Sequence, residues 1–76
     1  MNTTKHITIH TDAGLLTLPA PCSLDAALQH ILRRTGASDT QVATAVNGDF
    51  VARSLRAQHW LADGDTVLCF APITGG

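Results

Sequence analysis

The sequence contains no glutamate and no tyrosine, and charged residues make up only 14% of its 76 residues. Five Lys and Arg residues against six Asp residues give a net charge of −1. This balance argues against binding to nucleic acids or to a membrane through a polybasic segment, because both need concentrated positive charge. The first residues lack the apolar run of a signal peptide or a membrane span. We therefore expect a cytoplasmic protein that binds neither nucleic acid nor membrane.

Cysteine is also scarce, since Cys22 and Cys69 are the only two and lie far apart without a CxxC motif. Two thiols are too few for a small secreted domain held by disulfides. Free cysteines usually behave as small buried hydrophobes, so we expect both thiols to pack in the core. His6 and His10 share a predicted strand face but stand about 13 Å apart, too far to bind one metal ion together. No other ligand spacing indicates a metal site.

Apolar residues make up 45% of the chain, which excludes intrinsic disorder. The length predicts one domain over residues 1–76, and a domain of this size buries about 60% of the surface of its unfolded chain. A core this small rarely encloses a pocket of the usual few hundred Å³. The size therefore argues against a self-contained enzyme.

The hydrophobic pattern predicts the element order β-β-α-β-β-β. Ser23 is a suitable N-cap for a helix over residues 24–34, and Gly36 is suited to its C-terminal cap. The continuous apolar run from Thr66 to Phe70 favours a central strand covered on both faces. The fold class is then α+β, with one helix packed on one face of a mixed sheet. The predicted strands are 6–10, 15–18, 41–46, 50–52 and 66–70.

The sequence closes on Gly75 and Gly76, a pair that arises by chance in about one chain in 200. Without Cβ atoms, two glycines form a thin end that can thread a narrow channel. From Pro72 to Gly76 the chain can reach about 17 Å. We expect residues 71–76 to form a flexible tail that delivers the terminal carboxylate to a partner, with Ile73, Thr74 and Gly75 threading the channel.

Residues 6–76 resemble the ubiquitin-like β-grasp fold, most specifically from Val46 onward. The Leu-x-Asp-Gly-Asp turn of residues 61–65 and the Gly-Gly end are similar to those of the ThiS/MoaD sulfur-carrier family. The spacing from Asn47 to Asp63 resembles the thiamine-pathway branch (ThiS). The end from Phe70 to Gly76 instead resembles the molybdopterin-synthase small subunit (MoaD). Because an insertion alters the topology whereas tail residues drift, the internal spacing favours ThiS.

The resemblance implies a sulfur carrier that is a cosubstrate of partner enzymes and has no catalytic residues or bound cofactor of its own. A ThiF/MoeB-like adenylating enzyme would use ATP to activate the Gly76 carboxylate. A sulfur donor of the cysteine desulfurase or rhodanese type would convert it to a thiocarboxylate, and thiazole synthase would accept the sulfur. The free protein is expected to be a monomer. The alternatives are a MoaD-like subunit, a ubiquitin-like modifier and a non-covalent interaction module.

Several side chains are candidates for contact with these partners. The apolar residues that a helix-facing core explains least are Phe50, Trp60, Phe70 and Ile73. Their presence favours a docking patch on the uncovered sheet face, with Phe50, Trp60 and Phe70 as its candidate residues. An alternative is that Trp60 only covers the edge of the core. Arg53 and Arg56 are candidates for ionic contacts with a partner, and the alternative is that both are ordinary solvated charges.

Overall fold

The computed structural model describes residues 5–36 and 38–70, and its elements follow the predicted order. A single α-helix and a 3₁₀ helix accompany five strands in this part of the chain. The α+β fold class is therefore confirmed. The elements are β1 (His6–Thr11), β2 (Gly14–Pro19), α1 (Leu24–Thr35), β3 (Ala43–Val46), β4 (Asp49–Val51), the 3₁₀ helix η1 (Arg53–Gln58) and β5 (Val67–Phe70).

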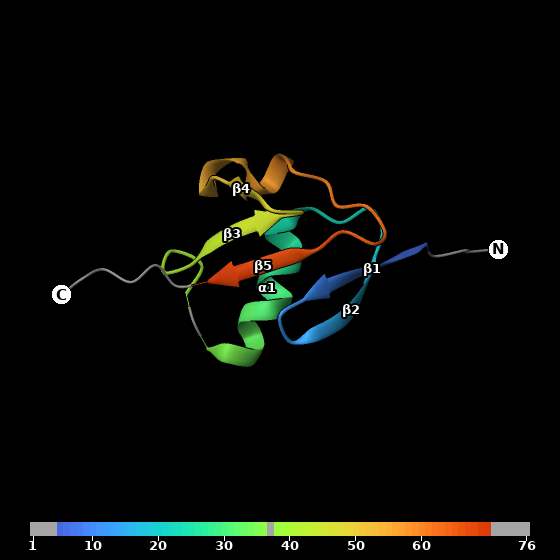
Figure 1. The fold of residues 1–76 in the computed structure, drawn as a ribbon, viewed down its shortest axis with the longest axis horizontal. Coiled ribbons are helices and arrows are strands. Elements are labelled where there is room, and N and C mark those ends of the chain that lie inside the picture. The colour runs from blue at the N-terminus through green and yellow to red at the C-terminus, as the bar shows by residue number, and fades with distance from the viewer. Residues whose placement is uncertain (1–4, 37, 71–76) are drawn as a thin grey trace.

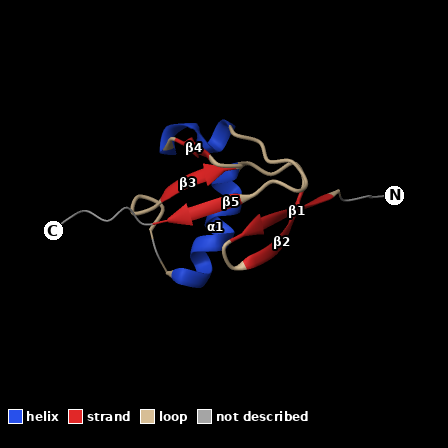
Figure 2. Cartoon of the chain, viewed as in Figure 1, coloured by secondary structure: helices blue, strands red, loops and turns tan. Residues whose placement is uncertain are grey.

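The strands form two antiparallel groups that lie side by side. β1 and β2 make a hairpin, whereas β4, β3 and β5 make a three-stranded sheet in that order. A parallel bridge between His10 and Thr66 links the two groups. β5 consequently lies between β3 and β1, and α1 lies behind the strands on one face (Figures 1 and 2). The arrangement is the mixed sheet with one covering helix that the sequence predicted.

The ends of α1 are fixed by local hydrogen bonds. The Ser23 hydroxyl accepts a bond from the Ala26 backbone N–H at 3.2 Å, which satisfies one of the free N–H groups of the first turn. At the other end Gly36 adopts φ 74°, and its N–H donates to the Leu32 carbonyl at 2.8 Å. Glycine suits this left-handed position because it has no Cβ. Both predicted caps are confirmed.

The core lies between α1 and the two strand groups. Residues from all of these elements are almost completely shielded from solvent, and each large side chain contributes about 1.5–3 kcal/mol by its burial. On α1 the buried side chains follow the i, i+3, i+4 spacing of one helix face, and they are Leu24, Ala27, Leu28 and Leu32. The largest fully buried apolar side chains are Ile9, Leu18, Leu24, Leu28 and Val67.

A polar network fastens the β3–β4 turn to the loop before β5. Asn47 has φ 52° and Gly48 has φ 88°, and a type I′ turn requires positive φ at both of its central residues. The Asn47 side chain donates to Asp65 Oδ1 at 3.0 Å and accepts from the Thr66 N–H at 2.9 Å. Asp65 Oδ2 accepts from the Ala62 N–H at 2.8 Å. The hydrogen bonds from Ala62 and Asn47 lower the pKa of the Asp65 carboxyl.

The structure corrects two expectations for β5. Leu68 and Phe70 are exposed, so the prediction that this strand is covered on both faces is wrong. The strand is central in the sheet, but among the described residues only the face toward α1 is covered. Cys69 is half-buried and not a packed core thiol, whereas Cys22 is buried as predicted.

Candidate functional site

An apolar patch covers the sheet face opposite α1. The register pairs Ala45 with both Phe50 and Leu68, and pairs Ala43 with Phe70. Paired residues point to the same side of a sheet with neighbouring Cβ atoms about 4.5–5.5 Å apart. Phe50 is 68% exposed and Phe70 is 50% exposed, although both are large and apolar. We call these five residues the apolar sheet patch.

Sequence reasoning found Phe50 and Phe70 but missed Leu68, which lies between them in the patch. Leu68 is 40% exposed. The period-two alternation of a strand could have indicated it, because residues 68 and 70 share one face and residue 67 lies on the other.

Trp60 lies away from this patch, beside the start of α1. It forms an isolated antiparallel bridge with Ser23, and the flanking backbone bonds run from Leu24 N to His59 O and from Leu61 N to Cys22 O. Its side chain is 63% exposed, so the alternative in which Trp60 covers the core edge is wrong. Its contact with a partner stays a prediction, separate from the patch.

The two arginines of η1 differ completely in their surroundings. Arg53 is exposed, and its contact with a partner stays a prediction. Arg56 is only 2% exposed, so the predictions that it contacts a partner or is a solvated charge are both wrong. Its guanidinium donates to Thr44 Oγ1 at 3.1 Å, to the Asp39 carbonyl at 3.0 Å and to the Val42 carbonyl at 2.8 Å. Arg56 is a structural anchor for the segment that leads into β3.

The predicted sulfur-attachment residue Gly76 and the threading residues Ile73, Thr74 and Gly75 lie outside the described residues. β5 ends at Phe70, immediately before this segment in the sequence. Phe70 also belongs to the apolar sheet patch. A partner that binds the patch is therefore within six residues of the Gly-Gly end along the chain.

The described residues offer little reactive chemistry. Burial raises the pKa of the Cys22 thiol. Burial and then the charge of Asp12 raise the pKa of the Cys69 thiol, against a lowering by Arg56. A higher pKa reduces the thiolate fraction and so the reactivity of both thiols at neutral pH. Among residues 5–36 and 38–70, no group of three or more His, Cys, Asp or Glu side chains is arranged to hold a metal ion.

None of the helices that the structure describes is both long and apolar enough to cross a bilayer.

Two solved structures share the fold of this chain. The thiamine biosynthesis protein (ThiS) from Geobacter metallireducens superposes with a TM-score of 0.69 at 18% identity, covering 92% of this chain and 100% of that one. A computationally designed protein based on human erythrocytic ubiquitin gives a TM-score of 0.60 at 27% identity, covering 93% of this chain and 95% of that one. The protein is thus a ubiquitin-like domain of the β-grasp class.

The family assignment is more specific. The sequence profile of the ThiS family matches residues 12–76, from the first hairpin turn through the Gly-Gly end. The chain therefore belongs to the ThiS family, a family of small sulfur carrier proteins that are not themselves enzymes. No curated protein sequence matches the chain significantly.

Proposed function

We propose that this protein carries sulfur as a thiocarboxylate on Gly76 for thiazole formation in thiamine biosynthesis. In the active site of an adenylating enzyme of the ThiF/MoeB type, the Gly76 carboxylate attacks ATP. This step forms the acyl-adenylate and releases pyrophosphate. A sulfur donor of the cysteine desulfurase or rhodanese type then displaces AMP through its persulfide sulfur. Reduction of the resulting acyl disulfide by a thiol leaves the thiocarboxylate, and thiazole synthase accepts its sulfur.

The observation that carries the proposal is the family match, which extends through the last residue. A carboxylate is a poor electrophile, and adenylation supplies AMP as its leaving group. The described residues contribute binding and position, because the reacting groups belong to the partners. The similar structure from Geobacter metallireducens, described as a thiamine biosynthesis protein, supports the choice of pathway.

The apolar sheet patch is the proposed docking surface for the adenylating enzyme. Large exposed apolar side chains that gather on one face mark interaction sites. Phe70 ends β5 next to the segment that carries Gly76, so docking here holds the reactive end close to the partner's active site. Holding a reactant in place in this way lowers the entropic barrier of the adenylation step.

Mass spectrometry of the intact protein tests the sulfur-carrier proposal. Incubation with ATP, the adenylating enzyme, a cysteine desulfurase, cysteine and a reducing thiol is expected to add the mass of one oxygen-to-sulfur exchange. Deletion of Gly76 is expected to abolish this change and leave the fold intact. A full mass shift in the variant without Gly76 would refute the proposed attachment site. Adducts on lysine side chains of other proteins would favour a ubiquitin-like modifier instead.

The docking surface is tested separately with a pair of leucine variants. Leu68→Asp places a charge in the patch, whereas Leu55→Asp places one on η1, which packs against α1 on the other side of the sheet. We expect Leu68→Asp to raise the KM for adenylation at least about tenfold, a loss of about 1.4 kcal/mol. Leu55→Asp should leave it unchanged. Equal KM values for the two variants would refute docking through the patch.

A second candidate function is a role as the small subunit of molybdopterin synthase. The observation that favours it is the end of the sequence, Phe-x-Pro-x-x-Gly-Gly from Phe70 to Gly76, which is similar to that of MoaD proteins. Deletion of the gene distinguishes the two pathways. We expect a requirement for thiamine, whereas loss of molybdenum-enzyme activity without a thiamine requirement would favour the second candidate.

A further inference from the structure

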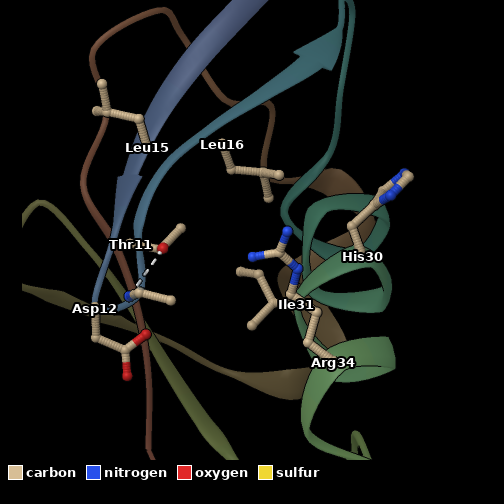
Figure 3. Close-up of a pocket in the computed structure, with 8 residues that line it drawn as sticks. Thr11, Asp12, Leu15, Leu16, His30, Ile31 and Arg34 are labelled. Carbon is tan, nitrogen blue, oxygen red and sulfur yellow. Dashed lines mark hydrogen bonds between the residues drawn. The ribbon is translucent and has the colours of Figure 1, made fainter.

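A groove lies between the tip of the β1–β2 hairpin and the second half of α1, on the side of the domain away from the apolar sheet patch. Its volume is about 170 Å³. Figure 3 shows the hairpin residues on one side and the helix residues on the other. We call it the hairpin–helix groove. The residues that matter here are Asp12, Leu16, His30, Ile31 and Arg34.

The groove combines an apolar floor with one free positive charge. Leu16 and Ile31 are half-buried and face each other across it (Figure 3). The Arg34 guanidinium lies beside Ile31 and extends into the space between helix and hairpin (Figure 3). Within residues 5–36 and 38–70, the Arg34 side chain has no hydrogen bond or ion pair. Asp12 stands at the hairpin end, so the two ends of the groove carry opposite charges.

The strand beside this groove has an open edge. Among the described strands β2 pairs only with β1. In an antiparallel pair every second residue directs its N–H and C=O away from the partner strand. In the described part of the chain, the backbone of residues 15–17 makes no hydrogen bond outside the hairpin. An edge of this kind is a template for one more strand.

The size of the groove distinguishes between classes of ligand. Pockets for small molecules usually measure about 300–1,000 Å³, so about 170 Å³ is too small for a cofactor and suits one side chain. An added strand obtains its affinity from main-chain hydrogen bonds and its specificity from pockets for alternate side chains. This site has the open edge of β2, a pocket that suits one side chain, and the positive charge of Arg34.

We propose that the hairpin–helix groove binds an extended segment of a partner protein that adds to β2 as a further strand. One apolar side chain of the segment enters between Leu16 and Ile31, and an acidic side chain that follows pairs with Arg34. This site goes beyond the proposed sulfur-carrier function, because neither Gly76 nor the apolar sheet patch takes part. Binding of a peptide is measured without sulfur transfer, so the two proposals fail independently.

Titration of the full-length ¹⁵N-labelled protein with a peptide tests this site. The probe is acetyl-Thr-Val-Thr-Leu-Thr-Asp-Asp-Gly-amide, together with its reversed sequence because either strand direction is open to test. We expect amide shifts confined to β2 and to the second half of α1. Shifts centred on the apolar sheet patch, or no shifts with either peptide at millimolar concentration, would overturn the proposal.

Two arginine variants provide the matched test of charge. Arg34→Glu and Arg33→Glu make the same charge change in the last turn of α1, but Arg33 does not line this groove. At physiological salt, where screening acts over about 8 Å, Arg34→Glu is expected to weaken binding at least about fivefold and Arg33→Glu less than about twofold. Equal weakening would overturn the pairing with Arg34.

Modified peptides test the strand pairing without changing the protein. Methylation of alternate peptide nitrogens removes the donors on one edge of the added strand. We expect one of the two alternate methylation patterns to abolish binding and the other to preserve it. Binding that survives both patterns would overturn strand addition. If isovalerate alone shifted the amide resonances of the groove residues with the same affinity as the peptide, the site would instead bind small carboxylates. If these resonances broadened as the protein concentration rose without any peptide, a second copy of the protein would be the occupant.

Discussion

The buried guanidinium of Arg56 holds the segment before β3, and its replacement by lysine is the most informative test of how the domain is stabilised. Arg56→Lys keeps the positive charge but loses the planar fork that reaches three acceptors in different directions. Those acceptors are Thr44 Oγ1 and the carbonyls of Asp39 and Val42. A lysine ammonium at the same depth cannot satisfy all of them.

The expected loss follows from these contacts. A hydrogen bond to a charged group contributes about 1.5–3 kcal/mol, and an unsatisfied buried acceptor carries a penalty of about 1–3 kcal/mol. With one of the three bonds retained, two acceptors lose their donor, and we expect Arg56→Lys to lower the free energy of unfolding by about 2–6 kcal/mol. A domain of this length has a total stability of about 4–11 kcal/mol. The change therefore removes a large part of the total.

Urea unfolding followed by far-UV circular dichroism measures this loss. Arg53→Lys is the matched control, because Arg53 belongs to the same 3₁₀ helix but is exposed. Its effect is expected to stay within about 0.5 kcal/mol. If the two variants lose the same free energy, the anchoring role of Arg56 is refuted. The double variant with Thr44→Val gives a second check, since residues that share a hydrogen bond should lose stability non-additively.

Three further predictions concern other polar and thiol groups. Asn47→Ala removes two side-chain hydrogen bonds and replaces a residue that tolerates φ 52° with one that does not. We expect the free energy of unfolding, measured in urea, to fall by about 1–3 kcal/mol. Asn47→Gly keeps the backbone freedom, and equal stability of the two variants would exclude a contribution from backbone strain. Because the folded-state pKa of Asp65 is lowered from 3.8, its stabilisation is present above that value and is lost as the pH falls below it. Asp65→Asn should therefore flatten the acid limb of stability against pH. Iodoacetamide at neutral pH should modify Cys69 before Cys22, and both more slowly than glutathione, as measured by mass spectrometry.

The local elements were predictable because their signals lie within a few residues. The Ser23 cap, the Gly36 cap and the Asn47-Gly48 turn each depend on the conformational preference of one or two residues. The helix stripe depends on a spacing of three and four residues, which the sequence displays directly. These preferences agree with the final fold, so local reasoning was sufficient for them.

The burial of Arg56 was not predictable in the same way. Nothing near it in the sequence distinguishes it from Arg53, which is exposed on the same helix. The difference comes from carbonyls of residues 39 and 42, which the fold brings to Arg56 from the far end of α1. A contact between segments so far apart leaves no periodic signal in the sequence.

The error at β5 has a different physical cause. A continuous apolar run is usual for a strand with two covered faces, yet the same run arises when the outer face is apolar for another reason. Leu68 and Phe70 are exposed on that outer face. The excess of apolar side chains over what the core requires is what marks the face as a candidate docking surface.

The positions of the apolar sheet patch and of β5 depend on polar anchors at both ends of β3. Before the strand, Arg56 binds the carbonyls of Asp39 and Val42, and within it the Thr44 hydroxyl. After the strand, the Asn47 side chain binds the loop that leads into β5. β3 is the middle strand of its sheet and pairs with both β4 and β5, which carry the aromatic side chains of the patch. Because side-chain direction alternates along a strand, a shift of β3 by one residue would turn its own patch residues, Ala43 and Ala45, toward the helix. It would also break their pairing with the patch residues of β4 and β5. The two anchors therefore fix the register of β3, and with it the apolar face that the sheet presents opposite α1.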